Sequence, residues 1–262
     1  MKYSRRELLK FSVISLSSGI VGCSGESKPS MPGQGRRRAT ASAPPDRIVF
    51  PGNPWPLGHA IVAFRWSARI EPDSGLWFDL HLESADYDSE DGGGVTEERE
   101  SSPNWESKIV WNNYNSCILS STQWDDDGFI ASPDGTPFDF DSLSGREFIV
   151  DPLPIEDDDR RAFGIYLQGH DSVAAHRIVF RQSDGGHRWS IDWSGKIALT
   201  YLGDDRFRYQ FEARVSDASF GGIALPPGTS RDQAISLLAR FVAVPANFSL
   251  RERDDQLWFD LT

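Results

Sequence analysis

Tryptophans that stand beside asparagines and aspartates are the residues of this chain best suited to bind a ligand. The sequence has nine tryptophans among 262 residues, and several lie in stretches without strand periodicity. An exposed indole ring can stack on a sugar or a peptide while polar neighbours orient the ligand. The candidate ligand-binding residues are Trp55, Trp105, Trp111, Asn113 and Trp124. The same rings could instead fold back onto the core, and the sequence leaves both interpretations open.

One acidic stretch has the spacing to hold a cation. Asp86, Asp88 and Glu90 place oxygen ligands at alternate positions, as calcium-binding loops do. Asp91 occupies the sixth position, where such loops have a glycine, so the match is partial. Calcium is the one metal or cofactor that these residues suggest, and solvated turns are the alternative.

Side chains for catalysis do not form a known pattern. None of the five histidines has the spacing of a zinc site. His170 and Asp171 could form a dyad, but no Gly-x-Ser-x-Gly motif supplies a nucleophile. A glycosidase needs two carboxylates about 5–9.5 Å apart, a separation that the sequence cannot show. We therefore assign no catalytic residue, and we favour a role without catalysis.

The first two dozen residues have the order of an export signal. Residues 4–10 read SRRELLK, a modest apolar run follows from 11 to 22, and residues 20–23 read IVGC. This stretch resembles a twin-arginine signal peptide joined to the lipobox of bacterial lipoproteins. A general secretory signal with paired arginines is the alternative. The apolar run is short and interrupted by Ser and Gly, which argues against a membrane span.

The resemblance implies a cellular location. Residues 1–22 would be removed, and Cys23 would carry the lipid that holds the protein on the extracytoplasmic side of the cell envelope, in the periplasm or at the cell surface. Cys117 would then be the only thiol left, which excludes a disulfide within the chain. Cys117 lies in an apolar stretch, so we expect a buried and inert thiol.

The charge of the chain excludes one class of partner. The net charge is −12, and it becomes −15 without residues 1–22, which hold four basic side chains and one acidic side chain. Such an acidic protein is not expected to bind nucleic acid. A basic protein partner fits the charge, although an acidic surface can also serve only solubility.

Strand periodicity defines one folded domain. Residues 23–46 are rich in Ser, Pro, Gly and Arg, which predicts a flexible tether. Residues 47–262 contain many short stretches of alternating apolar and polar residues and one helix pattern after residue 228, where Ser230 and Gln233 form a capping box. We predict a mainly β fold, a β-sandwich or jelly-roll-like arrangement of antiparallel sheets with one short C-terminal helix.

The clearest alternation runs from Arg188 to Val215. We predict three strands there, with a three-residue turn at 194–196 that places Trp193 opposite Ile197. A second hairpin is predicted between residues 59–70 and 76–82, a strand over 108–121, and a closing hairpin between 247–253 and 257–261. In the first strand of the second hairpin, the residues expected to point inward are Ala60, Val62, Phe64, Trp66, Ala68 and Ile70.

These features favour a lipoprotein that acts as a binding module for a glycan or a protein partner. Two alternatives remain open. One is a carbohydrate-active, glycosidase-like enzyme on the same β fold. The other is an immunity-type inhibitor of a basic secreted protein, which only the acidic charge suggests.

Overall fold

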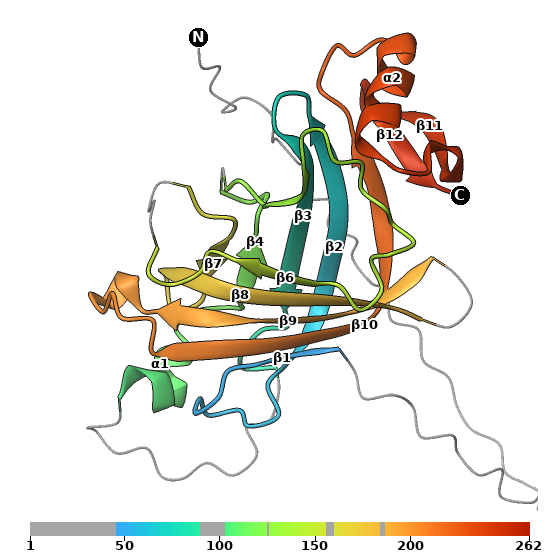
Figure 1. Ribbon diagram of the computed structural model, residues 1–262. Helices are drawn as coiled ribbons and strands as arrows, with labels where there is room; N and C mark the ends of the chain where they lie inside the picture. The colour runs from blue at the N-terminus through green and yellow to red at the C-terminus, as the bar shows by residue number, and fades with distance from the viewer. Residues whose placement is uncertain (1–45, 90–102, 125, 156–159, 184–186) are drawn as a thin grey trace, which may run out of the picture. The chain divides into compact units, whose positions relative to one another are not determined.

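Twelve β-strands make up most of the folded chain (Figure 1). The structure, a computed structural model, describes residues 46–89, 103–124, 126–155, 160–183 and 187–262. All of these belong to one unit, Pro44–Thr262. The predicted signal peptide, Cys23 and nearly all of the predicted tether lie outside the described residues.

The prediction of a mainly β fold with one short C-terminal helix is confirmed. The strands are β1 (Arg47–Val49), β2 (His59–Glu71), β3 (Gly75–Ser84), β4 (Ile118–Ser120), β5 (Phe129–Pro133), β6 (Glu147–Val150), β7 (Gly164–Tyr166), β8 (His170–Gln182), β9 (Arg188–Ala198), β10 (Tyr209–Ala224), β11 (Phe248–Arg253) and β12 (Gln256–Leu261). The helices are α1 (Lys108–Trp111) and α2 (Arg231–Phe241), with short 3-10 turns η1 (Asn104–Glu106), η2 (Thr200–Leu202) and η3 (Pro245–Asn247). No helix in the part of the chain that the structure describes has the length and apolar character needed to cross a bilayer.

Two layers of strands cross one another, with β2 and β3 running across β8 and β9 (Figure 1). The long strand β10 belongs to both layers. It pairs with β9 from Tyr209 to Ser219, with a register shift between Val215 and Ala218, and then pairs in parallel with β2 from Phe220. Strands that change layer through a bulge are typical of crossed sheet packing. The layers are therefore parts of one hydrogen-bonded sheet.

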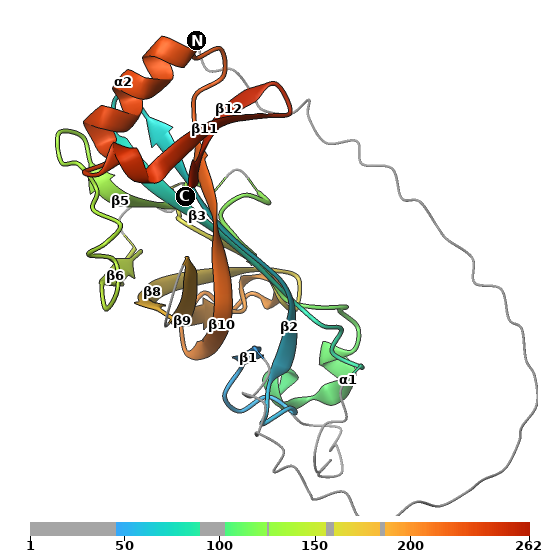
Figure 2. The same cartoon turned by 90° about the vertical axis from the view of Figure 1, so that its right-hand side faces the viewer.

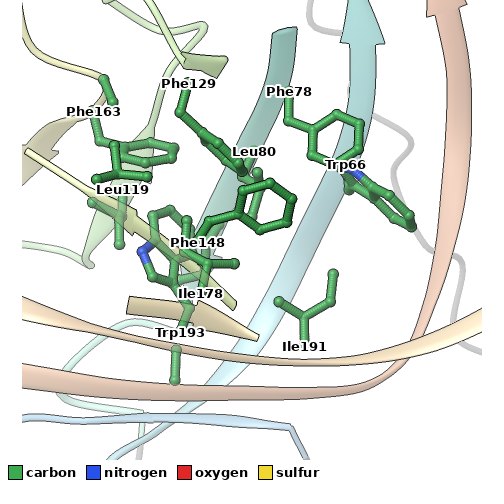
Figure 3. Close-up of a cluster of buried hydrophobic side chains, with 14 of the residues drawn as sticks. Trp66, Phe78, Leu80, Leu119, Phe129, Phe148, Phe163, Ile178, Ile191 and Trp193 are labelled. Carbon is green, nitrogen blue, oxygen red and sulfur yellow. The ribbon is translucent and has the colours of Figure 1, made fainter. Parts of the chain in front are cut away.

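The core fills the space between the two layers. Trp66, Phe78 and Leu80 point inward from β2 and β3, and Ile191 and Trp193 point inward from β9 (Figure 3). All five side chains are at least 98 % buried. Burying a large apolar side chain contributes about 1.5–3 kcal/mol relative to leaving it exposed, so each member of this cluster stabilises the fold.

The predicted turn at 194–196 is wrong. β9 continues through these residues to Ala198, so that Trp193 pairs with Ala213 and Ile197 pairs with Tyr209 on β10. A Cβ atom on Gly195 would lie 2.6 Å from Cε1 of Phe211 and 3.0 Å from Nδ1 of His176. Glycine is present here because two core rings occupy the space of a side chain, not because the chain turns.

The hairpin of β2 and β3 is confirmed, with Glu71 paired to Gly75 at its turn. The predicted inward face holds for Trp66, Ala68 and Ile70, but it fails nearer the start of β2. A register shift between Ile61 and Ala63 leaves Val62 62 % exposed and places His59 inside. The bulge therefore reverses which side chains point inward.

The C-terminal elements follow their sequence signals closely. The Ser230 Oγ accepts a hydrogen bond from the Gln233 N–H at 3.3 Å, and the Gln233 side chain accepts one from the Ser230 N–H at 2.9 Å, so the capping box is confirmed. β11 and β12 form the predicted closing hairpin, and α2 lies beside it (Figure 2). The predicted strand over 108–121 is wrong for its first half, where α1 forms, and only β4 pairs as a strand.

Candidate functional site

Three of the predicted ligand-binding tryptophans are buried. Trp55, Trp105 and Trp111 are 2 %, 3 % and 0 % exposed, so the expectation of exposed loop rings is wrong for them. Together with Phe50 and Tyr87 they form what we name the aromatic end cluster. The centroids of Trp105 and Trp111 are 5.2 Å apart, and those of Trp111 and Phe50 are 5.4 Å apart.

Local structure explains this burial. Residues 104–111 form η1 and α1 instead of a strand, and this brings both indoles of the segment inward. Each indole N–H finds a backbone acceptor: Trp105 donates to the carbonyl oxygen of Pro51 at 3.0 Å, and Trp111 to that of Trp105 at 2.8 Å. Asn113 is exposed on the turn after α1.

Trp124 has a different setting, because its half-buried ring lines an open pocket. The pocket has a volume of about 240 Å³. The ring centroid of Trp124 lies 5.7 Å from that of His170, and the two rings meet edge to face. We name this the Trp124 pocket; it is lined by Trp124, Asp126, Arg161, Phe163, Gly164, Ile165, His170 and Asp171.

Two parts of the chain that are distant in the sequence build this pocket: the segment between β4 and β5, and the β7–β8 hairpin with the residues just before it. Trp124 and Asp126 lie between β4 and β5, Gly164 lies on β7, and His170 opens β8. A Cβ atom on Gly164 would lie 2.6 Å from Oδ2 of Asp126 and 2.8 Å from Cε3 of Trp124. The glycine therefore allows the ring and the carboxyl group to approach the strand closely.

Asp126 is the most perturbed acid of the pocket. Burial raises the pKa of Asp126 to about 7, with further upward contributions from Asp127 and Asp151. The hydrogen bond donated by the Gly164 backbone N–H and the charge of Arg161 act in the opposite direction. The Oδ2 atom is buried and has no hydrogen-bond partner among the described residues. Such an atom retains the capacity to bond a polar ligand group.

Asp171 has a structural role instead. Its Oδ2 accepts a hydrogen bond from the Gln168 N–H at 3.0 Å, and its Oδ1 accepts one from the Tyr201 N–H at 3.2 Å. Burial raises the pKa of Asp171, and these two bonds counteract the rise. The carboxylate holds the β7–β8 turn against η2. His170 and Asp171 both line the pocket, but no Ser, Thr or Cys among the lining residues completes a nucleophilic triad with them.

A second hollow, of about 490 Å³, lies between β5 and β6. β5 pairs only with β3 and β6 only with β8 among the described strands, so both are edge strands. Arg69 lies here with its guanidinium 5.3 Å from the Trp77 ring centre, and it donates to Asp79 at 2.5 Å and to the Asp127 carbonyl oxygen at 2.5 Å. Sequence reasoning missed this hollow, because its residues come from strands that the sequence alone does not place together.

A buried histidine that sequence reasoning also missed lies between this hollow and the core. The Nδ1 of His176 accepts a hydrogen bond from the Trp193 indole N–H at 3.2 Å, and its Nε2 lies 4.0 Å from Oδ2 of Asp151. Burial lowers the pKa of His176 to about 3, so the ring is neutral. These contacts are typical of a histidine that is packed in the core.

The predicted calcium-binding residues and Cys117 lie in opposite settings, at the surface and in the core, where the structure describes them. Asp86 and Asp88 are exposed, whereas Glu90 lies outside the described residues, so the predicted calcium site stays a prediction. Within the described ranges no three His, Cys, Asp or Glu side chains gather closely enough to hold a metal ion. Cys117 is fully buried, as predicted, and burial raises its pKa.

Comparisons with known proteins add no further guide to the site. No protein-family model matches this chain, and neither the curated proteins nor the solved structures include a match.

Proposed function

We propose that this chain is a lipoprotein of the bacterial cell envelope whose β domain binds a glycan, without catalysis, at the Trp124 pocket. The observation that supports the proposal best is that a half-buried indole lies beside Oδ2 of Asp126, a carboxyl oxygen with no hydrogen-bond partner in the described part of the chain. An indole face stacks on the apolar face of a sugar, while a carboxyl group and a histidine bond its hydroxyl groups.

The size of the pocket suits one sugar unit. Its volume of about 240 Å³ lies just below the roughly 300–1,000 Å³ that is typical of drug-sized ligand sites. A protein partner, by contrast, usually needs about 800 Å² of surface on each side. We therefore favour a glycan end or a single exposed residue of a polysaccharide over a protein.

The carboxyl groups of the pocket favour binding over hydrolysis. A glycosidase needs two carboxyl groups that can both reach the substrate. Asp126 and Asp171 are the only carboxyl groups among the described lining residues, and both oxygens of Asp171 already accept backbone hydrogen bonds. One available carboxyl group can orient a sugar, but it cannot serve both as the general acid and as the nucleophile or base of a glycosidase.

The test compares two half-buried tryptophans. The mature chain is titrated with solubilised peptidoglycan fragments and envelope polysaccharides, and binding is followed by calorimetry. We expect Trp124→Ala to weaken binding by about tenfold or more, taking as a guide the roughly 1–3 kcal/mol that stacking of a nucleobase on an aromatic side chain contributes. Trp77→Ala, which removes an indole outside the pocket, should bind as the parent chain does. Equal affinities of all three chains would refute the proposal.

A glycosidase is the second candidate, and the raised pKa of Asp126 is the observation that favours it. A carboxyl group that titrates near pH 7 is suited to act as a general acid. Incubation of the bound glycan with the chain separates the two functions. Release of reducing ends that Asp126→Asn abolishes, with binding retained, would establish the enzyme and replace the binding module.

The lipid anchor needs its own measurement. Growth with an alkyne-bearing fatty acid should label the parent chain, and Cys23→Ser should remove the label together with the signal-peptide cleavage. Replacing Arg5 and Arg6 by lysines should block export if the twin-arginine route is used, and it should leave export intact if the general secretory route is used.

A further inference from the structure

The most exposed aliphatic side chains of the described residues stand at one end of the domain. Leu57 is 76 % exposed, Ile109 is 68 % exposed and Val62 is 62 % exposed. Single exposed apolar residues are ordinary on protein surfaces, so their exposure alone carries no meaning. Their shared position is informative, because all three lie around the place where the chain enters the folded domain.

Backbone contacts define this position. The carbonyl oxygen of Asp46 accepts a hydrogen bond from the N–H of Ile61 at 2.9 Å, directly before Val62. The guanidinium of Arg47 donates to the carbonyl oxygens of Leu57 and Gly58, each at 2.5 Å. The first described residues of the domain are therefore bonded to the segments that carry Leu57 and Val62.

Helix α1 brings Ile109 to the same end. The Nζ of Lys108 lies 5.6 Å from the ring centre of Trp55, two residues before Leu57. Both views show α1 at the same end of the domain as the segment between β1 and β2 (Figures 1 and 2). We name this surface the entry face and define it by Leu57, Val62 and Ile109.

The entry face is held outward by what lies beneath it. The aromatic end cluster fills the space behind the Leu57 segment and α1, and its tryptophans are almost completely buried. Gly58 has a φ of +67°, and a Cβ atom on it would lie 2.2 Å from the carbonyl oxygen of Ile48, so the turn after Leu57 requires a glycine. Leu57 cannot turn inward without displacing packed rings.

We propose that the entry face rests on the lipid surface that holds the anchor of the chain. The proposal relies on the lipidation of Cys23 that is proposed above. Ser24 to Asp46 comprise 23 residues, which can span at most roughly 80 Å when fully extended. The anchor therefore keeps the entry face near the bilayer, and this high local concentration populates a contact that would be negligible for a free protein.

The charges beside the entry face are balanced, although the chain as a whole is acidic. Arg47 and Lys108 stand next to its apolar residues, together with Asp46 and Glu106. Basic side chains near a bilayer are attracted by anionic headgroups, and exposed aliphatic side chains can insert at the boundary between headgroups and acyl chains. A lipid surface is thus the expected partner.

The experiment uses the full lipidated chain in vesicles of phosphatidylethanolamine and phosphatidylglycerol. A single cysteine is introduced by Leu57→Cys or Ile109→Cys and labelled with a fluorophore. A quencher in the headgroup region of the bilayer lowers the fluorescence of a label that lies close to the lipid. Cys117 is fully buried and Cys23 carries the lipid, so neither competes for the label. Ile149→Cys and Ile235→Cys provide matched controls, because these side chains are 60 % and 61 % exposed.

We expect the labels at Leu57 and Ile109 to be quenched about threefold or more above the two control labels, since an inserted residue lies within the boundary region of the bilayer. The additional change Val62→Asp should lower that quenching. Equal quenching at all four positions in a chain that floats with the vesicles would overturn the entry face and leave the anchor intact. A chain that does not float with the vesicles would overturn both the anchor and the entry face.

Discussion

The aromatic end cluster and the Trp124 pocket contain the same kind of residue in opposite settings. In the cluster, indole rings pack against other rings, and the indole N–H groups of Trp105 and Trp111 donate to backbone carbonyls. In the pocket, the Trp124 ring meets His170 edge to face and borders open space. The lesson is that a tryptophan in a loop is structural or functional according to what the rest of the fold places against it.

The polar atoms of the two regions differ in the same way. The indole N–H groups of Trp105 and Trp111 donate to backbone carbonyl oxygens, whereas the pocket has a buried carboxyl oxygen that finds no hydrogen-bond partner among the described residues. Leaving a buried polar atom unpaired costs about 1–3 kcal/mol, and a ligand that bonds to it recovers part of that cost. The cluster contributes to stability, and the unpaired oxygen of the pocket lowers it.

The largest effect should come from removing a ring of the cluster. Trp111→Ala should lower the free energy of unfolding by about 3–5 kcal/mol, because it leaves a cavity under α1 where no side chain can move in. Urea denaturation measures the loss. A loss below about 1 kcal/mol would mean that the cluster is loosely packed and would remove the contrast with the pocket.

Crowding the pocket should have the next largest effect. Gly164→Ala introduces a Cβ atom within 2.6 Å of Oδ2 of Asp126 and 2.8 Å of the Trp124 ring. We expect a loss of about 1–3 kcal/mol in stability, as for other overpacked sites, together with loss of glycan binding. The double variant Gly164→Ala with Trp124→Ala should recover part of the stability but none of the binding. Additive losses in denaturation would show that the ring and the strand are not in contact.

The titration of Asp126 should give a smaller effect that depends on pH. Burial raises the pKa of Asp126 to about 7, against an ordinary value of 3.8. Between these values the folded state holds a proton that the unfolded state has lost, so the contribution of this group to stability is complete at low pH and is lost as the pH rises toward 7.

Asp126→Asn removes this dependence. The stability of the variant relative to the parent chain should rise between about pH 4 and pH 7, by on the order of 1 kcal/mol once solvent screening of the half-exposed group is allowed for. Urea denaturation across this range gives the difference, and Asp88→Asn on the exposed surface serves as the control. A relative stability that is constant with pH would place the Asp126 carboxyl in water and not in the pocket.

The smallest effect on stability should come from Trp124 itself. Trp124→Ala should change the free energy of unfolding by less than about 1 kcal/mol, because its side chain is only partly buried and borders an open pocket. The same substitution carries the predicted loss of glycan binding. A destabilisation as large as that of Trp111→Ala would show that Trp124 is a further core residue, and the comparison between the two regions would fail.

Much of the fold could be predicted because its signals are local. The β2–β3 hairpin follows from alternation around a turn, and the start of α2 follows from Ser230 and Gln233, which bond one another three residues apart. The closing hairpin of β11 and β12 has the same basis. In each case the residues that form the element are the residues that indicate it.

The failures share the opposite property. Gly195 resembles a turn residue, but it lies in a strand because Phe211 and His176 occupy its side-chain space. Val62 alternates with Phe64, but the bulge between Ile61 and Ala63 turns it outward. In both cases the deciding contact comes from another strand.

By itself, the sequence determined the β-rich class, the capped helix, two hairpins and the expectation that Cys117 is buried. Only the tertiary structure decided which tryptophans are core and which one borders a pocket, and that the Trp124 ring meets the His170 ring. The physical reason is the distance along the chain over which each interaction acts. Periodicity and capping act between neighbours along the chain, whereas burial, pocket shape and the pKa of a carboxyl group depend on segments that meet only after the layers have packed.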